Sequence, residues 1–217
     1  DTGDDGINFA TGMGKGVQDS GQQASANIWT FNNFLRECHG GAIAAGSHTG
    51  AGISDMLVED NVMNHSDMPF RFKSAPVNGG GVSNILIRDC AVSDAQQVFV
   101  LSTTYSDANQ TVSVEPAVKP AEFANIQAYN ITADVITKNT MSMVADIDNT
   151  MPYKTYHTHH DLYFQDIAFT NIAKSLAKKS EVLQGISDTT FYDVTMDWTG
   201  IAKEEDDAAA GAYKAWA

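Results

Sequence analysis

Two adjacent acidic residues near the start of the sequence could act as an acid–base pair. Asp4 and Asp5 stand between Gly3 and Gly6, and Ile7 follows them. Neighbouring side chains of a regular strand point to opposite faces, so the two carboxylates share a face only if the backbone bends at the glycines. Two close carboxylates repel each other, so one can hold a proton while the other is charged, as glycoside hydrolysis requires. A calcium or turn site and a solvated acidic turn are the alternative interpretations of the pair alone.

Two later segments add a histidine and a pair of cations. His39 is followed by Gly40 and Gly41, and glycines allow a ligand or a neighbouring backbone to approach closely. Arg71 and Lys73 are two residues apart, so on a strand they lie on one face. Such cations repel each other unless an anion lies between or over them, and a substrate carboxylate would supply that anion. Taken alone, a structural histidine and two solvent-exposed cations are equally compatible with these residues.

In their order along the chain, the three segments resemble the motifs of the polygalacturonase family, family 28 of the glycoside hydrolases. That family carries Gly-Asp-Asp-Cys-Ile, then Gly-His-Gly, then Arg-Ile-Lys, where this sequence has residues 3–7, 38–40 and 71–73. The flanking residues are similar to the bacterial exo-acting branch, and the resemblance is strongest over residues 1–110. It implies inverting, exo-acting hydrolysis of the α-1,4 bonds of polygalacturonate in pectin, by a secreted or periplasmic enzyme. The implied partner is an acidic polysaccharide or oligogalacturonate, and no cofactor or metal is implied.

The resemblance also implies roles for single residues. Asp4 matches the acid that protonates the leaving oxygen, and Asp5 matches one of two carboxylates that activate water. His39 matches the histidine that assists the acid. The family's usual Cys is replaced by Gly6, and Cys38 replaces the first Gly of Gly-His-Gly.

Substrate binding is implied for three further residues. Arg71 and Lys73 match the pair that grips a galacturonate carboxylate, and Tyr105 is the best-placed match for a later tyrosine of the family. A rhamnogalacturonan or xylogalacturonan hydrolase on the same scaffold is an alternative, as is a β-helix that binds polysaccharide without catalysis. A pectate lyase is a weaker one, because it needs a calcium cluster and a basic proton acceptor in another arrangement.

The family's other water-activating Asp lies in an Asn-Thr-Asp type motif about one coil upstream, and these 217 residues do not contain that motif. We therefore expect the sequence to be the C-terminal part of a longer enzyme whose N-terminal coils are missing. On its own it is expected to be inactive or prone to aggregation, since an open end of stacked strands exposes apolar side chains.

The segments that must position these residues form a repeat. Each copy starts with Asn or Asp, continues with an aliphatic residue, and has Asn or Asp again at its sixth position. The copies are residues 27–33, 55–61, 84–90, 125–131, 161–167 and, more degenerate, 188–194. Their spacing predicts an all-β solenoid, a parallel β-helix, and the resemblance implies the right-handed, single-stranded, pectin-lyase-like form. An antiparallel sandwich would also have short strands, but it does not require this recurring pattern.

Stacked coils predict ladders of equivalent side chains. Strands about 4.8 Å apart bury each inward aliphatic residue against the same position of the next coil. One such ladder is expected to contain Ile28, Met56, Ile85, Ile126 and Leu162.

The whole sequence is expected to form one domain with surface loops and a C-terminal tail. Residues 1–200 are expected to form the β-helix, and residues 201–217 a tail or cap. Residues 13–26 are Gly-rich and predict a surface loop, residues 104–121 predict a long loop over one face, and no helical period is found before residue 172. Residues 157–160, His-Thr-His-His, are interpreted as a polar loop rather than a metal site. Cys38 and Cys90 are expected to be buried free thiols.

Net charge and hydropathy argue against nucleic acid and membranes as binding partners. The net charge is −14, which disfavours nucleic acid and anionic membranes as partners, since both require basic surface. No apolar run approaches the roughly 18 residues of a membrane span.

Overall fold

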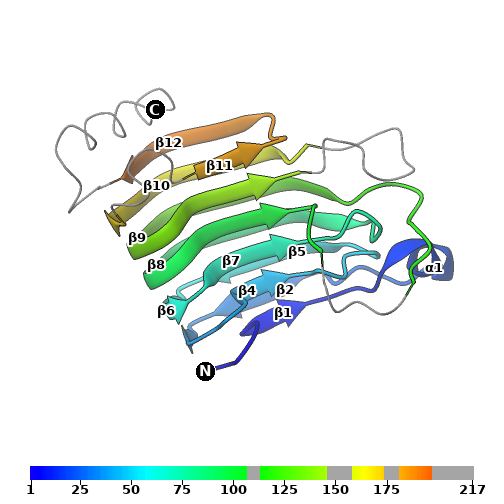
Figure 1. Cartoon of the computed structure of the whole chain (residues 1–217), viewed down its shortest axis with the longest axis horizontal. Helices are drawn as coiled ribbons and strands as arrows, with labels where there is room; N and C mark the ends of the chain where they lie inside the picture. Colours follow the sequence, from blue (N-terminus) through cyan, green and yellow to red (C-terminus); the bar gives the residue numbers. More distant parts are fainter. Residues whose placement is uncertain (107–112, 146–157, 174–180, 197–217) are drawn as a thin grey trace.

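The chain folds into a stack of parallel coils, shown in Figure 1 with β1 near one end and β12 near the other. The computed structural model describes residues 1–106, 113–145, 158–173 and 181–196. Every strand pair in this part of the chain is parallel, and the main path through the sheet runs β1-β4-β7-β8-β9-β10-β12. Parallel pairing of each coil with the next is the architecture of a parallel β-helix, as the repeat predicts.

The first coils are divided into short strands and the later coils into long ones. The short strands are β1 Ile7–Phe9, β2 Ile28–Phe31, β3 Phe34–Arg36, β4 Gly41–Ala45, β5 Ile53–Glu59, β6 Val62–Ser66 and β7 Met68–Lys73. The later strands are β8 Gly81–Ser102, β9 Glu122–Val144, β10 His160–Ile172, β11 Glu181–Gln184 and β12 Thr189–Met196.

The strands form three faces. The first face joins β2, β5 and the first parts of β8, β9, β10 and β12. The second face joins β3, β6 and the next parts of the same four long strands. The third face joins β1, β4, β7, the ends of β8 and β9, and β11. The third face holds most of the candidate site residues.

The predicted aliphatic ladder is present on the first face. Ile28 lies opposite Met56, Met56 opposite Ile85, Ile85 opposite Ile126, and Ile126 opposite Leu162. All of these side chains except Ile28 are buried, and Ile28 packs against the core from a partly buried position. The inward residues of the repeat therefore build the core between successive coils.

The Asn and Asp positions of the repeat are corners of the coil. In all six copies the first and sixth residues have φ between 46° and 58°, the left-handed region that Asn and Asp tolerate better than most residues. Corner side chains also bond along the stack, since the Asn84 amide donates to Asp55 Oδ1 at 3.0 Å and the Asn125 amide donates to Asn84 Oδ1 at 2.9 Å. The repeat thus marks where the backbone turns.

The surface loop predicted at residues 13–26 contains a helix, so that prediction is wrong, although the sequence shows no helical period there. Helix α1, Gly14–Ser20, ends at Gly21, whose φ is 69°. Seven residues are too few to establish a helical period, and contacts to other segments hold the helix in place. The Gly14 N–H donates to the Asn78 carbonyl at 2.9 Å, and Gln18 Oε1 accepts the Val118 N–H at 2.9 Å.

The histidine-rich segment is not a polar loop, at least in its described part. His159 is fully buried and stacks on Phe123 with ring centroids 5.2 Å apart, and burial lowers the pKa of its imidazole to about 4. His160 is the first residue of β10 and bonds Glu122 Oε1 at 2.7 Å. His157 lies outside the described residues. A buried, neutral imidazole acts here as an aromatic core residue, which the polar sequence around it conceals.

Several smaller predictions can be compared with the structure. Cys38 and Cys90 are free and buried, as expected, and burial raises the pKa of the Cys90 thiol to about 11. The described parts of residues 104–121 form a loop without strands. The boundary at residue 200 and the segment 201–217 fall outside the described residues. Within residues 1–106, 113–145, 158–173 and 181–196, no group of three or more His, Cys, Asp or Glu could hold a metal ion, and no helix is long and apolar enough to cross a membrane.

Candidate functional site

The acidic pair lies at the entrance to β1, where the third face begins. Asp4 is exposed, whereas the Asp5 side chain is only 10% exposed. The Asp5 N–H donates to Asp4 Oδ1 at 2.8 Å, so the two residues are coupled through the bend that the sequence predicts. The two carboxylates consequently have different surroundings, one facing solvent and one enclosed.

The Asp5 carboxylate is bound by donors from three neighbouring coils. Its Oδ1 accepts the Gly41 N–H at 2.5 Å, and its Oδ2 accepts Lys73 Nζ at 2.8 Å and Asn8 Nδ2 at 3.0 Å. Arg71 Nη1 lies 3.7 Å from Oδ1. Asp5 is thus fixed in one orientation by β1, β4 and β7 together.

Arg71 and Lys73 share the outer side of β7, as their spacing predicts. Phe70 and Phe72 alternate with them and are fully buried, while the two cationic side chains are 17% and 8% exposed. In this structure the anion beside the cations is Asp5 rather than a substrate. Lys73 contacts Asp5 directly, whereas the longer contact of Arg71 leaves guanidinium N–H groups available for a further anion.

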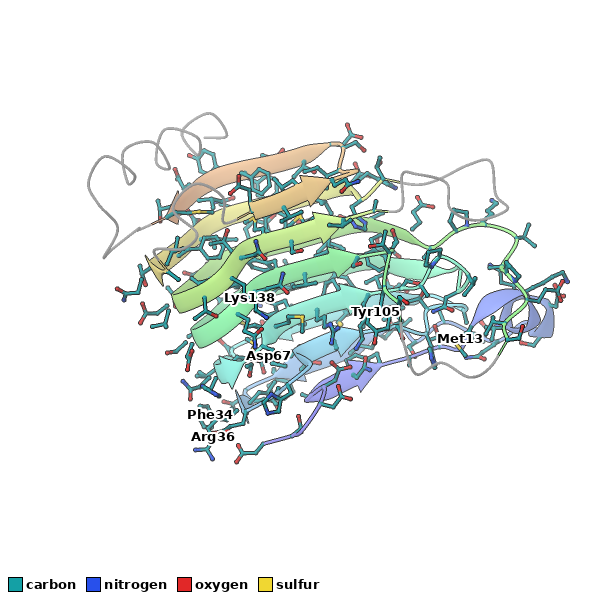
Figure 2. The ribbon with its side chains drawn as sticks, in the orientation of Figure 1. Met13, Phe34, Arg36, Asp67, Tyr105 and Lys138 are labelled. Carbon is teal, nitrogen blue, oxygen red and sulfur yellow. The ribbon has the colours of Figure 1, made fainter. Side chains whose placement is uncertain are left out.

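Tyr105 joins the same cluster from the loop after β8. Its ring centroid is 5.5 Å from Arg71 Cζ and 5.3 Å from Lys73 Nζ, within the range of cation–π attraction. The Tyr105 N–H donates to the Ser74 carbonyl at 3.0 Å, which fixes the start of this loop beside the end of β7. Tyr105 is labelled in Figure 2.

The glycines after His39 leave space for the acidic pair. A Cβ at Gly40 would lie 2.8 Å from Asp4 Oδ1 and 2.7 Å from the Asp5 nitrogen, and closer still to Asp5 Oδ1. A Cβ at Gly41 would lie 2.7 Å from Arg71 Cβ. Only glycine permits these close approaches, so the segment that carries His39 is packed directly against the acids.

His39 itself is exposed and contacts an acid that the sequence interpretation missed. Its Nδ1 lies 3.8 Å from Asp67 Oδ2, with side-chain exposures of 66% and 26%. Asp67 follows His39 by 28 residues, the same spacing that separates the first two copies of the repeat, so the repeat carried a usable signal. Asn8, which donates to Asp5, was also missed and has no comparable signal.

The two departures from the family motifs meet in space. A Cβ at Gly6 would lie 3.0 Å from Cys38 Sγ and 2.7 Å from the Ala42 carbonyl oxygen. The thiol of Cys38 therefore fills room beside residue 6 that a side chain there would require. A side chain at residue 6 would also meet the Ala42 backbone more closely than the thiol, and neither departure removes an acid–base group.

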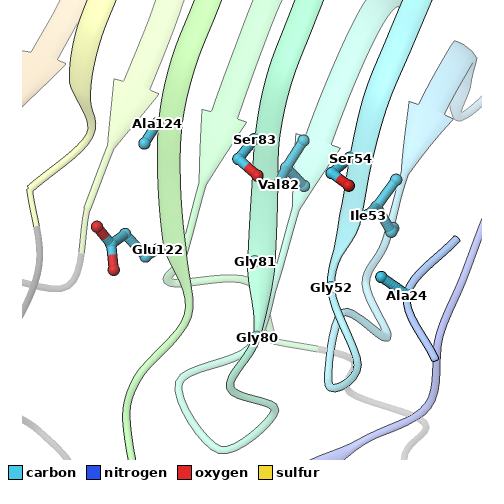
Figure 3. A pocket seen from close by; sticks show the side chains of 10 residues that line it. All are labelled: Ala24, Gly52, Ile53, Ser54, Gly80, Gly81, Val82, Ser83, Glu122 and Ala124. Carbon is cyan, nitrogen blue, oxygen red and sulfur yellow. The ribbon is translucent and has the colours of Figure 1, made fainter. Parts of the chain in front are cut away.

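A separate hollow of about 390 Å³, drawn in Figure 3, has none of the candidate site residues in its lining. It is lined by Ala24, Gly52, Ile53, Ser54, Gly80, Gly81, Val82, Ser83, Glu122 and Ala124. Glu122 is the single ionisable side chain among these lining residues, and it is bound by His160. This hollow lacks a pair of carboxylates, so it is not the candidate active site.

Fold and site together define a parallel β-helix with an acid pair, a histidine and two cations at one end of its third face. Comparison with known proteins agrees with this class. Residues 1–154 match the sequence model of glycosyl hydrolases family 28. An exo-poly-alpha-D-galacturonosidase of Dickeya chrysanthemi is 37% identical over 196 residues, which are 90% of this chain and 30% of that protein.

A solved structure is similar over the same extent. The family 28 exopolygalacturonase of Yersinia enterocolitica matches 91% of this chain and 32% of its own, with a TM-score of 0.75 and 33% sequence identity. The chain belongs to glycosyl hydrolase family 28. It spans about a third of the length of these relatives. The similarity covers about nine tenths of this chain and so extends beyond residues 1–110, over which the motif resemblance is strongest.

Proposed function

We propose that the protein containing this chain hydrolyses the α-1,4-glycosidic bonds of polygalacturonate, the acidic polysaccharide of pectin. The observation that carries the proposal is the enclosed Asp5 carboxylate, held beside Asp4 by Lys73, Asn8 and the Gly41 N–H. Two carboxylates in unlike surroundings are what a hydrolase needs in order to use one as acid and the other as base.

In the proposed reaction Asp4 is the proton donor and Asp5 is a proton acceptor. Asp4 is exposed and can reach the glycosidic oxygen, which takes its proton as the bond to the anomeric carbon breaks. A water molecule attacks that carbon from the opposite side and gives its proton to Asp5. This single displacement inverts the anomeric configuration. The fixed orientation of Asp5 supports its role, because a base acts only within hydrogen-bond reach of the proton it removes.

We assign recognition of the substrate's carboxylate to Arg71, assisted by Lys73 and Tyr105. Arg71 makes the looser contact with Asp5 and retains donors in the planar arrangement that binds a carboxylate bidentately. The Tyr105 ring beside both cations can restrict their movement and offer a face to a sugar ring.

We infer exo action, because both relatives described above carry exo-acting names. Polymeric pectin lies outside the bacterial cytoplasm, so a secreted or periplasmic location is proposed with it. Arg71 and Lys73 lie in one small cluster with Asp5, which fits recognition of a galacturonate unit by a chain whose net charge is −14.

The experiment is release of reducing sugar from polygalacturonate by the full-length protein, compared with its Asp4→Asn and Asp5→Asn variants. We expect each variant to lose activity by at least about a hundredfold, the usual contribution of a positioned acid or base. Short products from the first time points would support exo action, and NMR of the first product would give its anomeric configuration. Binding of polygalacturonate without any product would refute hydrolysis.

A further inference from the structure

We propose that Asp67 is a positioning residue for His39 and that it determines which ring nitrogen of His39 carries the proton. Gln96 and Lys138 hold Asp67 in place, and we call Asp67, Gln96 and Lys138 the corner array. The consequence for catalysis rests on the proposed function, but the contacts themselves do not.

The backbone of Asp67 is fixed between the coils that precede and follow it. Its N–H donates to the Cys38 carbonyl at 2.9 Å, one residue before His39. Its own carbonyl accepts the N–H groups of Gln96 and Gln97 at 3.1 and 2.9 Å. Asp67 is therefore part of the stack, and its side chain starts from a defined point beside His39.

The side chains of the corner array form a chain with a fixed direction. Gln96 Nε2 donates to Asp67 Oδ1 at 2.5 Å, and Lys138 Nζ donates to Gln96 Oε1. An ammonium group has no acceptor, so Lys138 requires the amide oxygen and leaves the amide nitrogen for Asp67. The other carboxylate oxygen, Oδ2, is the one that faces His39 Nδ1. Asp67 and Lys138 are labelled in Figure 2.

An irregularity in the sheet brings Lys138 to Gln96. Ala95 pairs with Ile136 but Gln97 pairs with Asn139, so β9 has one more residue than β8 at this point. Such bulges bend a strand and redirect side chains, and they are common beside active sites. Without the extra residue, Lys138 would not be aligned with Gln96.

A neighbouring acid does not compete for His39. Asp94 lies on the same corner and bonds His65 Nδ1 at 2.5 Å through Oδ2. His65, Asp67, Asp94 and Gln96 line one hollow of about 200 Å³, so the two acids are close together but serve different histidines. Asp94 is therefore a matched control for Asp67.

A carboxylate that faces Nδ1 favours a proton on that nitrogen and leaves the lone pair on Nε2. The contact of 3.8 Å is longer than a hydrogen bond, and contacts of this kind in unliganded sites shorten when substrate binds. His39 held in this form keeps Nε2 as a hydrogen-bond acceptor, on a segment that Gly40 and Gly41 bring against the acidic pair. Asp67 acts only through His39, as the acid of a catalytic triad acts through its histidine.

The test is side-chain NMR of the full-length protein labelled with ¹⁵N, at a pH where imidazole is neutral, with His39 assigned through a His39→Gln variant. We expect His39 to carry its proton on Nδ1 in the natural protein. In Asp67→Ala the proton should move to Nε2, the form that a free imidazole side chain prefers, while Asp94→Ala should leave the His39 signals unchanged. A His39 ring with the same protonated nitrogen in Asp67→Ala and in the natural protein overturns the proposal.

Kinetics on polygalacturonate give a second measurement. Asp67→Ala is expected to lower kcat about 10- to 100-fold, in the range found for residues that orient a functional histidine, with KM changed less than about twofold. Lys138→Met should also lower kcat, by a smaller factor than Asp67→Ala does. If the protein is inactive on polygalacturonate but its His39 proton still moves in Asp67→Ala, the proposed function is refuted and the positioning role is supported.

Discussion

Replacing Lys73 by Met tests how the Asp5 carboxylate is stabilised. Met keeps most of the apolar stem of lysine but removes the ammonium group that lies 2.8 Å from Asp5 Oδ2. Both side chains are nearly enclosed, with exposures of 8% and 10%, so water cannot replace the lost partner easily. We expect Lys73→Met to lower the free energy of unfolding by about 3 kcal/mol, as measured when one partner of a buried pair is removed.

The magnitude is the balance of three contributions. At 2.8 Å and an effective dielectric constant of about 20, the attraction between the charges is about 6 kcal/mol. The variant no longer buries the ammonium group, and this offsets a few kcal/mol of the loss. Arg71 at 3.7 Å and the Gly41 N–H still bind Asp5 Oδ1, so the carboxylate is not left without partners.

The assay is urea unfolding, with a double-mutant cycle that adds Asp5→Asn. If the two groups stabilise each other, the double variant should lose at least about 2 kcal/mol less than the sum of the single losses. Lys15→Met is the matched control, because Lys15 pairs with Asp19 on the surface of α1, where solvent screens the pair, so its loss should change the free energy of unfolding much less than Lys73→Met does. A loss below about 1 kcal/mol in Lys73→Met, or additive single losses, would show that the other partners hold Asp5 without Lys73.

Three further perturbations follow from the structure. Burial lowers the pKa of His159 to about 4, so between about pH 6.5 and 4 the unfolded chain binds a proton that the folded chain does not. Urea unfolding should therefore show a stability loss of up to about 3 kcal/mol as the pH falls through this window. Gly40→Ala would place a methyl group against Asp4 and Asp5, and its activity on polygalacturonate should fall at least about a hundredfold. Val135→Asn should raise the free energy of unfolding by about 1 kcal/mol, since Val135 has a φ of 59° that a β-branched residue adopts at a cost.

Each of these perturbations has its own control. In His159→Phe the pH dependence of stability should become shallower than in the natural protein, and an unchanged slope would mean that other groups cause it. Gly16→Ala should keep full activity and gain up to about 1 kcal/mol, because no atom lies within 4 Å of its added carbon and the residue is helical. If Val135→Gly and Val135→Asn both leave stability unchanged, the backbone at this corner is not strained.

The sequence predicts two of the three corners because a backbone requirement limits which residues can stand there. A positive φ at consecutive coils selects Asn and Asp, so the repeat is visible without an alignment. The third corner contains Glu37, His65, Asp94, Val135 and Asn171, all with positive φ but without a common residue type. Packing and stacking hold these residues in place, so the third corner cannot be predicted from the residue types at these positions.

The same distinction applies to the site. That Asp4, Asp5, Arg71 and Lys73 lie together could be predicted from the family resemblance of their motifs, whereas their types and spacing alone left other interpretations open. Asn8 could not be singled out, because a single polar residue gains a partner only when another coil is stacked beside it, whereas Asp67 could have been found from its 28-residue spacing to His39. The fit of Gly6 to Cys38 and the burial of His159 likewise depend on contacts between segments distant in the chain.

The register of the third face connects stability to the proposed chemistry. Asp5 bonds residues 36 and 68 positions away, and these contacts need Ile7 opposite Ile43 and Ala44 opposite Arg71. A shift of one residue in β7 would turn Phe70 and Phe72 outward and the two cations inward, because strand side chains alternate. That shift would bury both charges in the core and expose two aromatic rings, each at a cost of several kcal/mol. The hydrophobic core that fixes the coils thus also holds Lys73 against Asp5, so a variant that weakens the stacking of β7 should lose the acid–base geometry before the whole β-helix unfolds.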